Sequence, residues 1–307
     1  MIDKKITIGA GDIPAIMGVS PWKKPVDVWL EKLGYVEPDL PSEAMQIGTK
    51  LEPKIIEMYE EEKGVKCTTA QYPDNVYHHP IDDWAVAQID AKVTNDHNKT
   101  VEIKYATLTG AWLTGIPQYV QMQCQWQMYV VGTKCVDVAV LFTRAYPNSQ
   151  RRFNVFVLQR DEEQIKTIYE VAKKFYNENL LANIMPADNL TGEGIQKYIR
   201  EQYPADKKSE YIQATAEDEE LIEKLIMYKE KVQQMQMQIE NIESKLKLRI
   251  KDHVGMHAEK LNATIMWKTQ ERKNVDNKKI YDDYKVELSK YTTKTTLRPF
   301  RLFYSEV

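Results

Sequence analysis

The sequence predicts a mixed α/β fold over residues 1–190, followed by a long helix and a small basic α+β region. Two patterns support this division. Apolar runs of strand length alternate with amphipathic helical stretches in the first part. A heptad-like apolar repeat begins only beyond a polar stretch. We therefore expect four parts: 1–190, a linker at 191–212, a coiled coil or long helix at 213–252, and the basic region at 253–307.

The elements of the first part follow from the periodicity of its apolar residues. A recurrence every three or four positions predicts a helix, whereas a short β-branched run predicts a buried strand. Glycines are expected to end two of the helices, at Gly64 and Gly132. The expected helices are 13–17, 25–33, 48–62, 118–131 and 162–181, and the expected strands are 84–89, 100–106, 136–142 and 153–158.

The later part of the chain has the clearest repeat. Eight apolar residues alternate spacings of four and three, which is typical of a coiled-coil seam or of one arm of a helical hairpin. The alternative is one helix packed on its own domain. The eight residues are Leu221, Leu225, Tyr228, Val232, Met235, Ile239, Ile242 and Leu246. Strands are expected at 263–268 and 298–304, with a short helix at 274–284.

Composition excludes several classes of protein. Apolar residues make up 43% of the chain and charged residues 28%, as in a folded globular protein. No apolar run is long enough to cross a membrane, and the first residues do not resemble a signal peptide, so we expect a cytoplasmic location. Three cysteines without metal-ligand spacing argue against a disulfide framework or a zinc site. Lys and Arg outnumber Asp and Glu from Lys245 onward, which is compatible with contact to a polyanion.

The main chemical signal is a pair of neighbouring strand-like runs. Asp90 ends the first run, and Glu102 and Lys104 lie in the second. Residues i and i+2 of a strand point to one face, so Glu102 and Lys104 project together while Ile103 points into the core. A hairpin that folds Asp90 back beside Glu102 would bring two carboxylates and an ammonium together.

This combination of groups suits phosphodiester hydrolysis. The carboxylates of Asp90 and Glu102 and the backbone carbonyl of Ile103 are hard oxygen ligands of the kind that Mg²⁺ takes. Lys104 would orient or help deprotonate the attacking water, or stabilise developing negative charge. The same spacing is also met by a surface salt bridge on a hairpin, and that alternative stays open.

Other segments, in their order along the chain, add to this signal. They are GAGDIPAIMGVSPW at 9–22, WLEK at 29–32, GTKLEP at 48–53, Asp90, EIK at 102–104 and 121–132. Together they resemble the YqaJ-type viral recombinase family, which is similar to phage lambda exonuclease and belongs to the PD-(D/E)XK nuclease superfamily. The resemblance covers residues 4–180. It implies a restriction-endonuclease-like core, with a central mixed sheet flanked by helices.

The resemblance also assigns roles by position. Asp90 falls at the family's metal-binding aspartate, and Glu102 and Lys104 at its E-x-K pair. Glu52 falls at a glutamate that completes the acidic site and is a further candidate metal ligand. Gln125 falls on the polar face of the helix that lines the site. The alternative for the glutamine run is a partly solvated amphipathic helix.

Five residues are candidate DNA contacts. Gln123 and Tyr119 lie on the same predicted helix as Gln125. Gly11 stands where the family has a serine that helps hold a 5′-phosphate, and Lys4 stands where it has an arginine. Gly11 offers only its backbone N–H, so we expect a weak preference for phosphorylated ends. Trp22 either stacks on a base at a frayed end or packs the N-terminal helix.

The function implied by the resemblance is a Mg²⁺-dependent exonuclease, with Mn²⁺ as the alternative metal. It would degrade one strand of linear double-stranded DNA from the 5′ end, for recombination by single-strand annealing. A single-strand annealing protein is the implied partner, a homo-oligomer in the form of a trimeric ring the implied assembly, and the cytoplasm of a bacterial host the implied location. Two alternatives stay open: an endonuclease of the same fold acting on internal or branched DNA, and a non-catalytic DNA-binding or assembly module.

Overall fold

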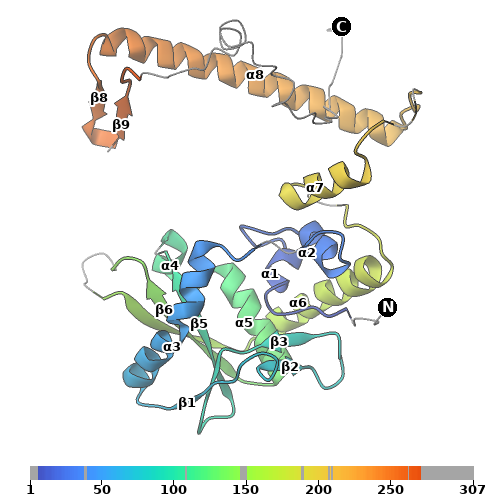
Figure 1. Cartoon of the computed structure of the whole chain (residues 1–307), viewed down its shortest axis with the longest axis vertical. Helices are drawn as coiled ribbons and strands as arrows, with labels where there is room; N and C mark the ends of the chain where they lie inside the picture. The colour runs from blue at the N-terminus through green and yellow to red at the C-terminus, as the bar shows by residue number, and fades with distance from the viewer. Residues whose placement is uncertain are drawn as a thin grey trace, which may run out of the picture. The chain divides into compact units, whose positions relative to one another are not determined.

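The chain divides into two compact units, Met1–Pro204 and Ala205–Val307 (Figure 1). The computed structural model describes residues 6–37, 40–107, 109–145, 151–187, 190–206, 208, 210–261 and 263–270. The helix expected at 274–284 and the strand expected at 298–304 lie outside these residues. No helix in the described ranges is long and apolar enough to cross a membrane.

A five-stranded mixed sheet forms the centre of the first unit, in the order β1-β4-β5-β6-β7. The strands β5 and β6 run parallel, and the other neighbours run antiparallel. A separate two-stranded sheet pairs β2 with β3. The strands are β1 (Cys67–Thr68), β2 (Val76–His78), β3 (Val86–Gln88), β4 (Ala91–Val93), β5 (Lys99–Ala106), β6 (Cys135–Phe142) and β7 (Phe153–Gln159).

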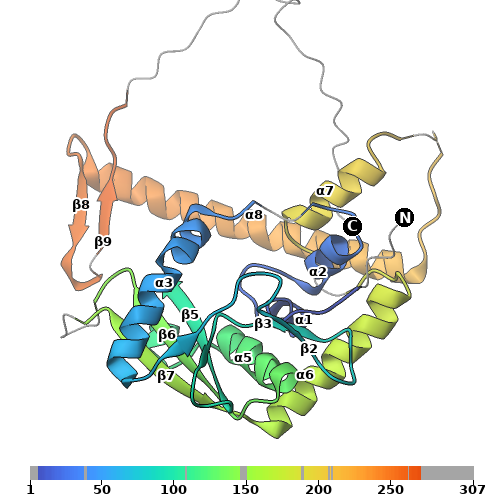
Figure 2. The same ribbon diagram turned by 60° about the horizontal axis from the view of Figure 1, so that its bottom comes forward.

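Helices cover both faces of this sheet, as Figures 1 and 2 show. Apolar side chains of α3 pack on one face, and those of α4 and α5 pack on the other. The opposite side of α5 packs against α1, α2 and α6, so α5 is enclosed on nearly all sides. The helices are α1 (Ile13–Ile16), α2 (Pro25–Lys32), α3 (Glu43–Lys63), α4 (Gly110–Thr114), α5 (Gln118–Val131), α6 (Glu162–Lys174), the π-helical segment η1 (Phe175–Leu181) and α7 (Glu193–Gln202).

The predicted fold class is confirmed: the first unit is a mixed α/β structure with a central mixed sheet between helices. The helix α5 has the predicted bounds, and Gly64 and Gly132 end α3 and α5 in the left-handed conformation that glycine adopts without strain. The hairpin of β4 and β5 brings Asp90 beside β5, as the sequence predicted. The strand expected at 84–89 is shorter, β3, and pairs with β2 rather than with β5.

Several boundaries differ from the prediction, and two of these differences are large. Helix α3 begins at Glu43 rather than at residue 48, because the Ser42 hydroxyl caps it by accepting the Met45 N–H. The stretch predicted as a linker at 191–212 contains helix α7, whose Ile195 is buried among the first unit's core residues. Its Tyr198 lies edge-on to Tyr35, so the first unit extends past residue 190.

The second unit contains the long helix α8 (Ala216–Ile250) and a two-stranded sheet of β8 (Gly255–Ala258) and β9 (Ala263–Met266), with the short 3₁₀ segment η2 (Glu259–Leu261) between them. Thr215 begins α8 with a reciprocal cap: its hydroxyl accepts the Asp218 N–H, and Asp218 accepts the Thr215 N–H. The long helix predicted at 213–252 is therefore present.

A buried polar contact joins α3 to the sheet. The Tyr59 hydroxyl donates a 2.8 Å hydrogen bond to Asp137, and Lys99 lies 3.4 Å from the same carboxylate oxygen. Asp137 is fully buried, and its other carboxylate oxygen has no hydrogen-bond partner among the described residues. Burial and the bond to Asp137 raise the pKa of the Tyr59 hydroxyl, so this hydroxyl stays protonated and donates.

We expect Tyr59→Phe to destabilise the first unit by about 1.5–3 kcal/mol, the usual value of a hydrogen bond to a charged group. The substitution removes a donor from a carboxylate that is already short of partners. Urea unfolding followed by tryptophan fluorescence measures this, since every tryptophan except Trp267 lies in the first unit. Tyr211→Phe is the control because Tyr211 is fully exposed. Equal unfolding midpoints for the two variants would show that the Tyr59 contact adds nothing.

Candidate active site

The hairpin of β4 and β5 brings the predicted acidic residues together. Ala91 pairs with Val101 across the hairpin, which places Asp90 beside the centre of β5. The Asp90 carboxylate accepts a 2.8 Å hydrogen bond from the backbone N–H of Ile103. The Ile103 side chain packs with α3 on one face of the sheet, so its backbone stays next to Asp90 while its side chain anchors the strand.

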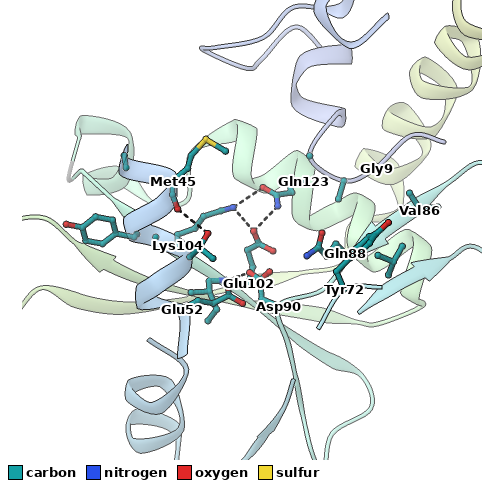
Figure 3. Close-up of a pocket in the computed structure, with 18 of the residues that line it drawn as sticks. Gly9, Met45, Glu52, Tyr72, Val86, Gln88, Asp90, Glu102, Lys104 and Gln123 are labelled. Atoms are coloured by element: carbon teal, nitrogen blue, oxygen red, sulfur yellow. Dashed lines mark hydrogen bonds and ion pairs between the residues drawn. The ribbon is translucent and has the colours of Figure 1, made fainter. Parts of the chain in front are cut away.

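Glu102 points to the opposite face of the sheet, where α5 covers it. Its carboxylate is only 3% exposed, yet both oxygens have partners. One oxygen accepts hydrogen bonds from Lys104 at 2.5 Å and from Gln123 at 2.8 Å. The other accepts a 2.6 Å bond from Gln127. Lys104 also donates to the Gln123 amide oxygen at 3.1 Å, which closes a three-membered network (Figure 3).

Asp90, Glu102, Lys104 and Gln123 line one cavity of about 720 Å³. Figure 3 shows Asp90, Glu102 and Lys104 from the sheet facing Glu52 from α3. The Gly9–Gly11 loop forms another part of the wall, and the remaining lining comes from the start of α3, from β3 and from Tyr72. Four groups that are separated by up to 52 positions in the sequence therefore share one solvent-connected space.

The carboxylates of Glu52, Asp90 and Glu102 lie close enough in this cavity to disfavour one another's charged form. Burial and then the nearby Glu102 carboxylate raise the pKa of Asp90 well above its ordinary value. The same two causes, in the same order, raise the pKa of Glu52. Burial alone would lower the pKa of Lys104, but Glu102 and Asp90 outweigh it and raise that pKa. Lys104 is therefore an ammonium at neutral pH.

The donor set fits a hard divalent cation. A cation would relieve the repulsion that raises the pKa of Glu52 and Asp90, and carboxylate oxygens are the ligands that Mg²⁺ prefers. Within the described part of the chain, no three His, Cys, Asp or Glu side chains are grouped closely enough to enclose a metal ion. Mg²⁺ in proteins is usually bound through one or two carboxylates and keeps positions for water and phosphate. Asp90, Glu102 and the Ile103 carbonyl would hold the ion, with Glu52 beside them.

One predicted site residue lies elsewhere. The sequence assigned Gln125 to the site, but its amide bonds to the Gln159 carbonyl at 2.9 Å and to the Asp161 N–H at 3.0 Å. Gln123 and Gln127 occupy the position expected for it, because they are one helical turn apart on the face of α5 that meets Glu102. Gln125 is two positions from each, which rotates it by about 200° on a helix with 3.6 residues per turn. The sequence analysis did not identify Gln127.

We expect Gln127→Leu to slow DNA digestion about 10- to 100-fold, because the variant loses a hydrogen bond to a charged group worth about 1.5–3 kcal/mol. Gln127 does not face the cavity; it positions the Glu102 carboxylate, so DNA affinity is expected to stay unchanged. Gln125→Leu is the matched variant. It loses two backbone contacts and should lower the melting temperature without changing the rate per folded molecule. A rate loss confined to Gln125→Leu would restore the assignment made from the sequence.

The candidate DNA contacts are more dispersed. Gly11 lines the cavity, and Gly9 N–H donates to Asp12 at 2.7 Å, which closes the loop that carries Gly11. Trp22 is 72% exposed and lies edge-on to Tyr119, with ring centroids 5.0 Å apart. Trp22 therefore does not pack the N-terminal helix, and its ring is accessible. Lys4 lies outside the described residues.

The comparisons with known proteins match a range of the chain that contains this site. Residues 3–134, which include Glu52, Asp90, Glu102 and Lys104, match the family model described as the YqaJ-like viral recombinase domain. The chain is 26% identical to the uncharacterized protein YqaJ of Bacillus subtilis (strain 168) over 309 residues, which cover 98% of this chain and 92% of that protein.

Two solved structures are similar to part of the chain. An alkaline exonuclease from Laribacter hongkongensis is 23% identical, with a TM-score of 0.46, over 58% of this chain and 89% of its own. A phage-related exonuclease from Haemophilus somnus 129PT is 14% identical, also with a TM-score of 0.46, over 59% of this chain and 97% of its own.

Proposed function

We propose that this chain, which carries a YqaJ-like viral recombinase domain over residues 3–134, is a metal-dependent exonuclease for the ends of double-stranded DNA. One observation carries the proposal: Glu52, Asp90, Glu102 and Lys104 line a single cavity, although they come from a helix, the segment between β3 and β4, and a strand. An isolated surface salt bridge on a hairpin would need neither Glu52 nor the two glutamines that bind Glu102.

The residues of the chain have distinct roles in this proposal. When bound, Mg²⁺ would supply Lewis-acid chemistry, lowering the pKa of water and offsetting phosphate charge. Asp90 and Glu102 supply the carboxylates that hold the ion, and Gln123 and Gln127 keep Glu102 in its orientation. Lys104 is a cation at neutral pH, which favours orienting the water and stabilising negative charge over acting as a base.

A comparison of linear and covalently closed circular duplex DNA tests the exonuclease proposal. We expect the linear DNA, labelled at either end, to lose label in the presence of Mg²⁺ while the closed circle stays intact. Cutting of the closed circle at a similar rate would favour the endonuclease alternative. Binding of both DNA forms without cutting either would favour the non-catalytic module. Release of label from the 5′ end first would support the proposed 5′ to 3′ direction.

The dependence on a 5′-phosphate can be tested at Gly11. Among the described residues, no atom lies within 4 Å of the position that a Cβ would take at Gly11, so a larger side chain fits. We expect Gly11→Ser to add a hydroxyl donor to the cavity wall and to increase the preference for phosphorylated over unphosphorylated ends by about 5- to 10-fold, as one hydrogen bond of about 1–1.5 kcal/mol provides. The measurement is the ratio of digestion rates on the two substrates. A large preference already present in the unsubstituted chain would mean that another group holds the phosphate.

Further features belong to the same proposal. The role would be in phage-type recombination, with a single-strand annealing protein as partner, Mn²⁺ as an alternative metal and a ring of copies around the duplex. These features rest on the family resemblance alone. Co-purification of the chain with an annealing protein encoded beside it would test the partner.

A further inference from the structure

Within the second unit, helix α8 has an apolar stripe that is largely exposed. Helix α8 is one uninterrupted helix of 35 residues (Figures 1 and 2). The eight predicted seam residues lie along it, from Leu221 to Leu246. Over this distance the stripe is about 38 Å long, at about 1.5 Å per residue. Six of the eight are 48–66% exposed: Leu221, Tyr228, Val232, Met235, Ile239 and Ile242. A stripe of this length needs a partner to bury it.

The charges on α8 are separated between its two ends. The acidic end consists of Glu217, Asp218, Glu219, Glu220 and Glu223. The basic end consists of Lys245, Lys247, Arg249 and Lys251. The acidic residues lie in the first two turns of the helix, and the basic residues lie in the last two turns and at its C-terminal cap. Two such helices side by side in opposite directions would place each acidic end beside a basic end.

We propose that α8 is the interface with a second copy of this chain, in which the two α8 helices pack antiparallel. The spacing of the stripe supports this register. Read as heptads, the stripe begins at a d position and ends at an a position, so a full antiparallel overlap sets every a residue opposite a d residue. Leu221 then faces Leu246 of the second copy, and Val232 faces Met235 of the second copy near the twofold axis. Further out in the same register, Asp218 lies opposite Arg249 of the second copy at both ends.

The end charges favour this direction over a parallel pair. A parallel pair would place acidic end beside acidic end and basic end beside basic end, which is repulsive. The charges at the positions that flank the seam do not favour the antiparallel pair over the parallel pair. The antiparallel pair brings Lys224 near Lys245 of the second copy, and the parallel pair brings it near Lys229 of the second copy. Acidic residues at the N-terminus and basic residues at the C-terminus also stabilise a single helix through its dipole. Because this stabilisation needs no partner, association has to be measured separately from helix content.

The first test is the mass of the full chain by sedimentation equilibrium. We expect the unsubstituted chain to form an assembly with an even number of copies, and we expect Val232→Glu combined with Ile239→Glu to halve the mass of that assembly. Gln233→Glu combined with Gln234→Glu is the control, because positions 233 and 234 are on the outer face of the heptad and the two substitutions add the same charge. Circular dichroism should show that all variants keep their helix. A mass unchanged by the seam substitutions, whatever the number of copies, would overturn the proposal.

The second test is the direction of packing. Ile222 and Glu243 both flank the seam, and the antiparallel register places Ile222 beside Glu243 of the second copy. We expect the variant Ile222→Cys with Glu243→Cys to form a disulfide between these two positions of different chains on mild oxidation, identified by peptide mapping. The native cysteines lie in the first unit and give different peptides. A dimer without this cross-link would refute the antiparallel arrangement. Neither test depends on nuclease activity, so the failure of the proposed function would leave this inference intact.

Discussion

We expect Lys104→Ala to reduce DNA digestion by at least about 10³-fold, near the upper range for one positioned acid–base or electrostatic group. The ammonium lies 2.5 Å from Glu102 and is held by Gln123, and among the described residues that line the cavity Lys104 is the one cationic side chain. DNA binding should survive, because one lysine is a small part of the electrostatic contact with a phosphate backbone. Gel-shift assays with Ca²⁺ and digestion assays with Mg²⁺ measure the two properties separately.

The control for this variant is Lys66→Ala. Lys66 is 80% exposed and pairs with Glu60 at a different cavity, so both variants lose one positive charge. Digestion at the normal rate by Lys104→Ala would show that the lysine has no role in the reaction. A large loss of DNA binding in Lys104→Ala alone would mean that it is chiefly a DNA contact.

The second large effect is expected at Glu102. Glu102→Gln keeps the shape of the side chain but removes the charge that both glutamines and Lys104 bind. We expect digestion to fall at least about 10³-fold, and we expect the affinity for Mg²⁺ to fall with it, because a carboxylate ligand is lost. Isothermal titration with Mg²⁺ and with Mn²⁺, together with the digestion rate, checks both parts.

A second acidic cavity supplies the control. Glu57, Glu60 and Glu61, from the C-terminal half of α3, line a separate cavity together with Lys66. Glu61→Gln removes one negative charge there. If Mg²⁺ affinity falls equally in Glu61→Gln and Glu102→Gln, the ion binds the acidic surface in general and not the candidate active site.

The central part of the site was predictable because a strand has a simple period. Glu102 and Lys104 are two positions apart, so any strand at 100–106 brings them together. Asp90 was predictable from the short polar turn that separates the two runs. Glu52 was assigned only through the family resemblance, because nothing local in the sequence of α3 links it to a strand 50 residues later.

The glutamines show where sequence patterns fail. Polar and apolar residues alternate along α5, and the helix is buried on nearly all sides. Such a helix has no polar face from which its rotation can be predicted. Three glutamines therefore looked equivalent, and only the packing of Val120, Cys124 and Met128 on the sheet shows which ones reach Glu102.

Two helices were missed in part because glycines indicated a break. Gly48 disfavours a helix interior, so the start of α3 was set too late, although the Ser42 cap and the rest of the helix outweigh it. In α7, Gly192 and Gly194 indicated a linker, while Ile195 packs into the core three residues after the first glycine. In each case tertiary packing overrode the local preference.

The most direct test of the account compares the unsubstituted chain with Asp90→Asn on end-labelled linear duplex DNA. The asparagine oxygen can still accept the Ile103 N–H, so the variant removes the charge and keeps the contact. With excess chelator neither protein should release label. After Mg²⁺ is added, the unsubstituted chain should digest the DNA while Asp90→Asn stays inactive. Release of label in the presence of chelator, or equal rates from both proteins, would contradict a metal-dependent nuclease site at this cavity.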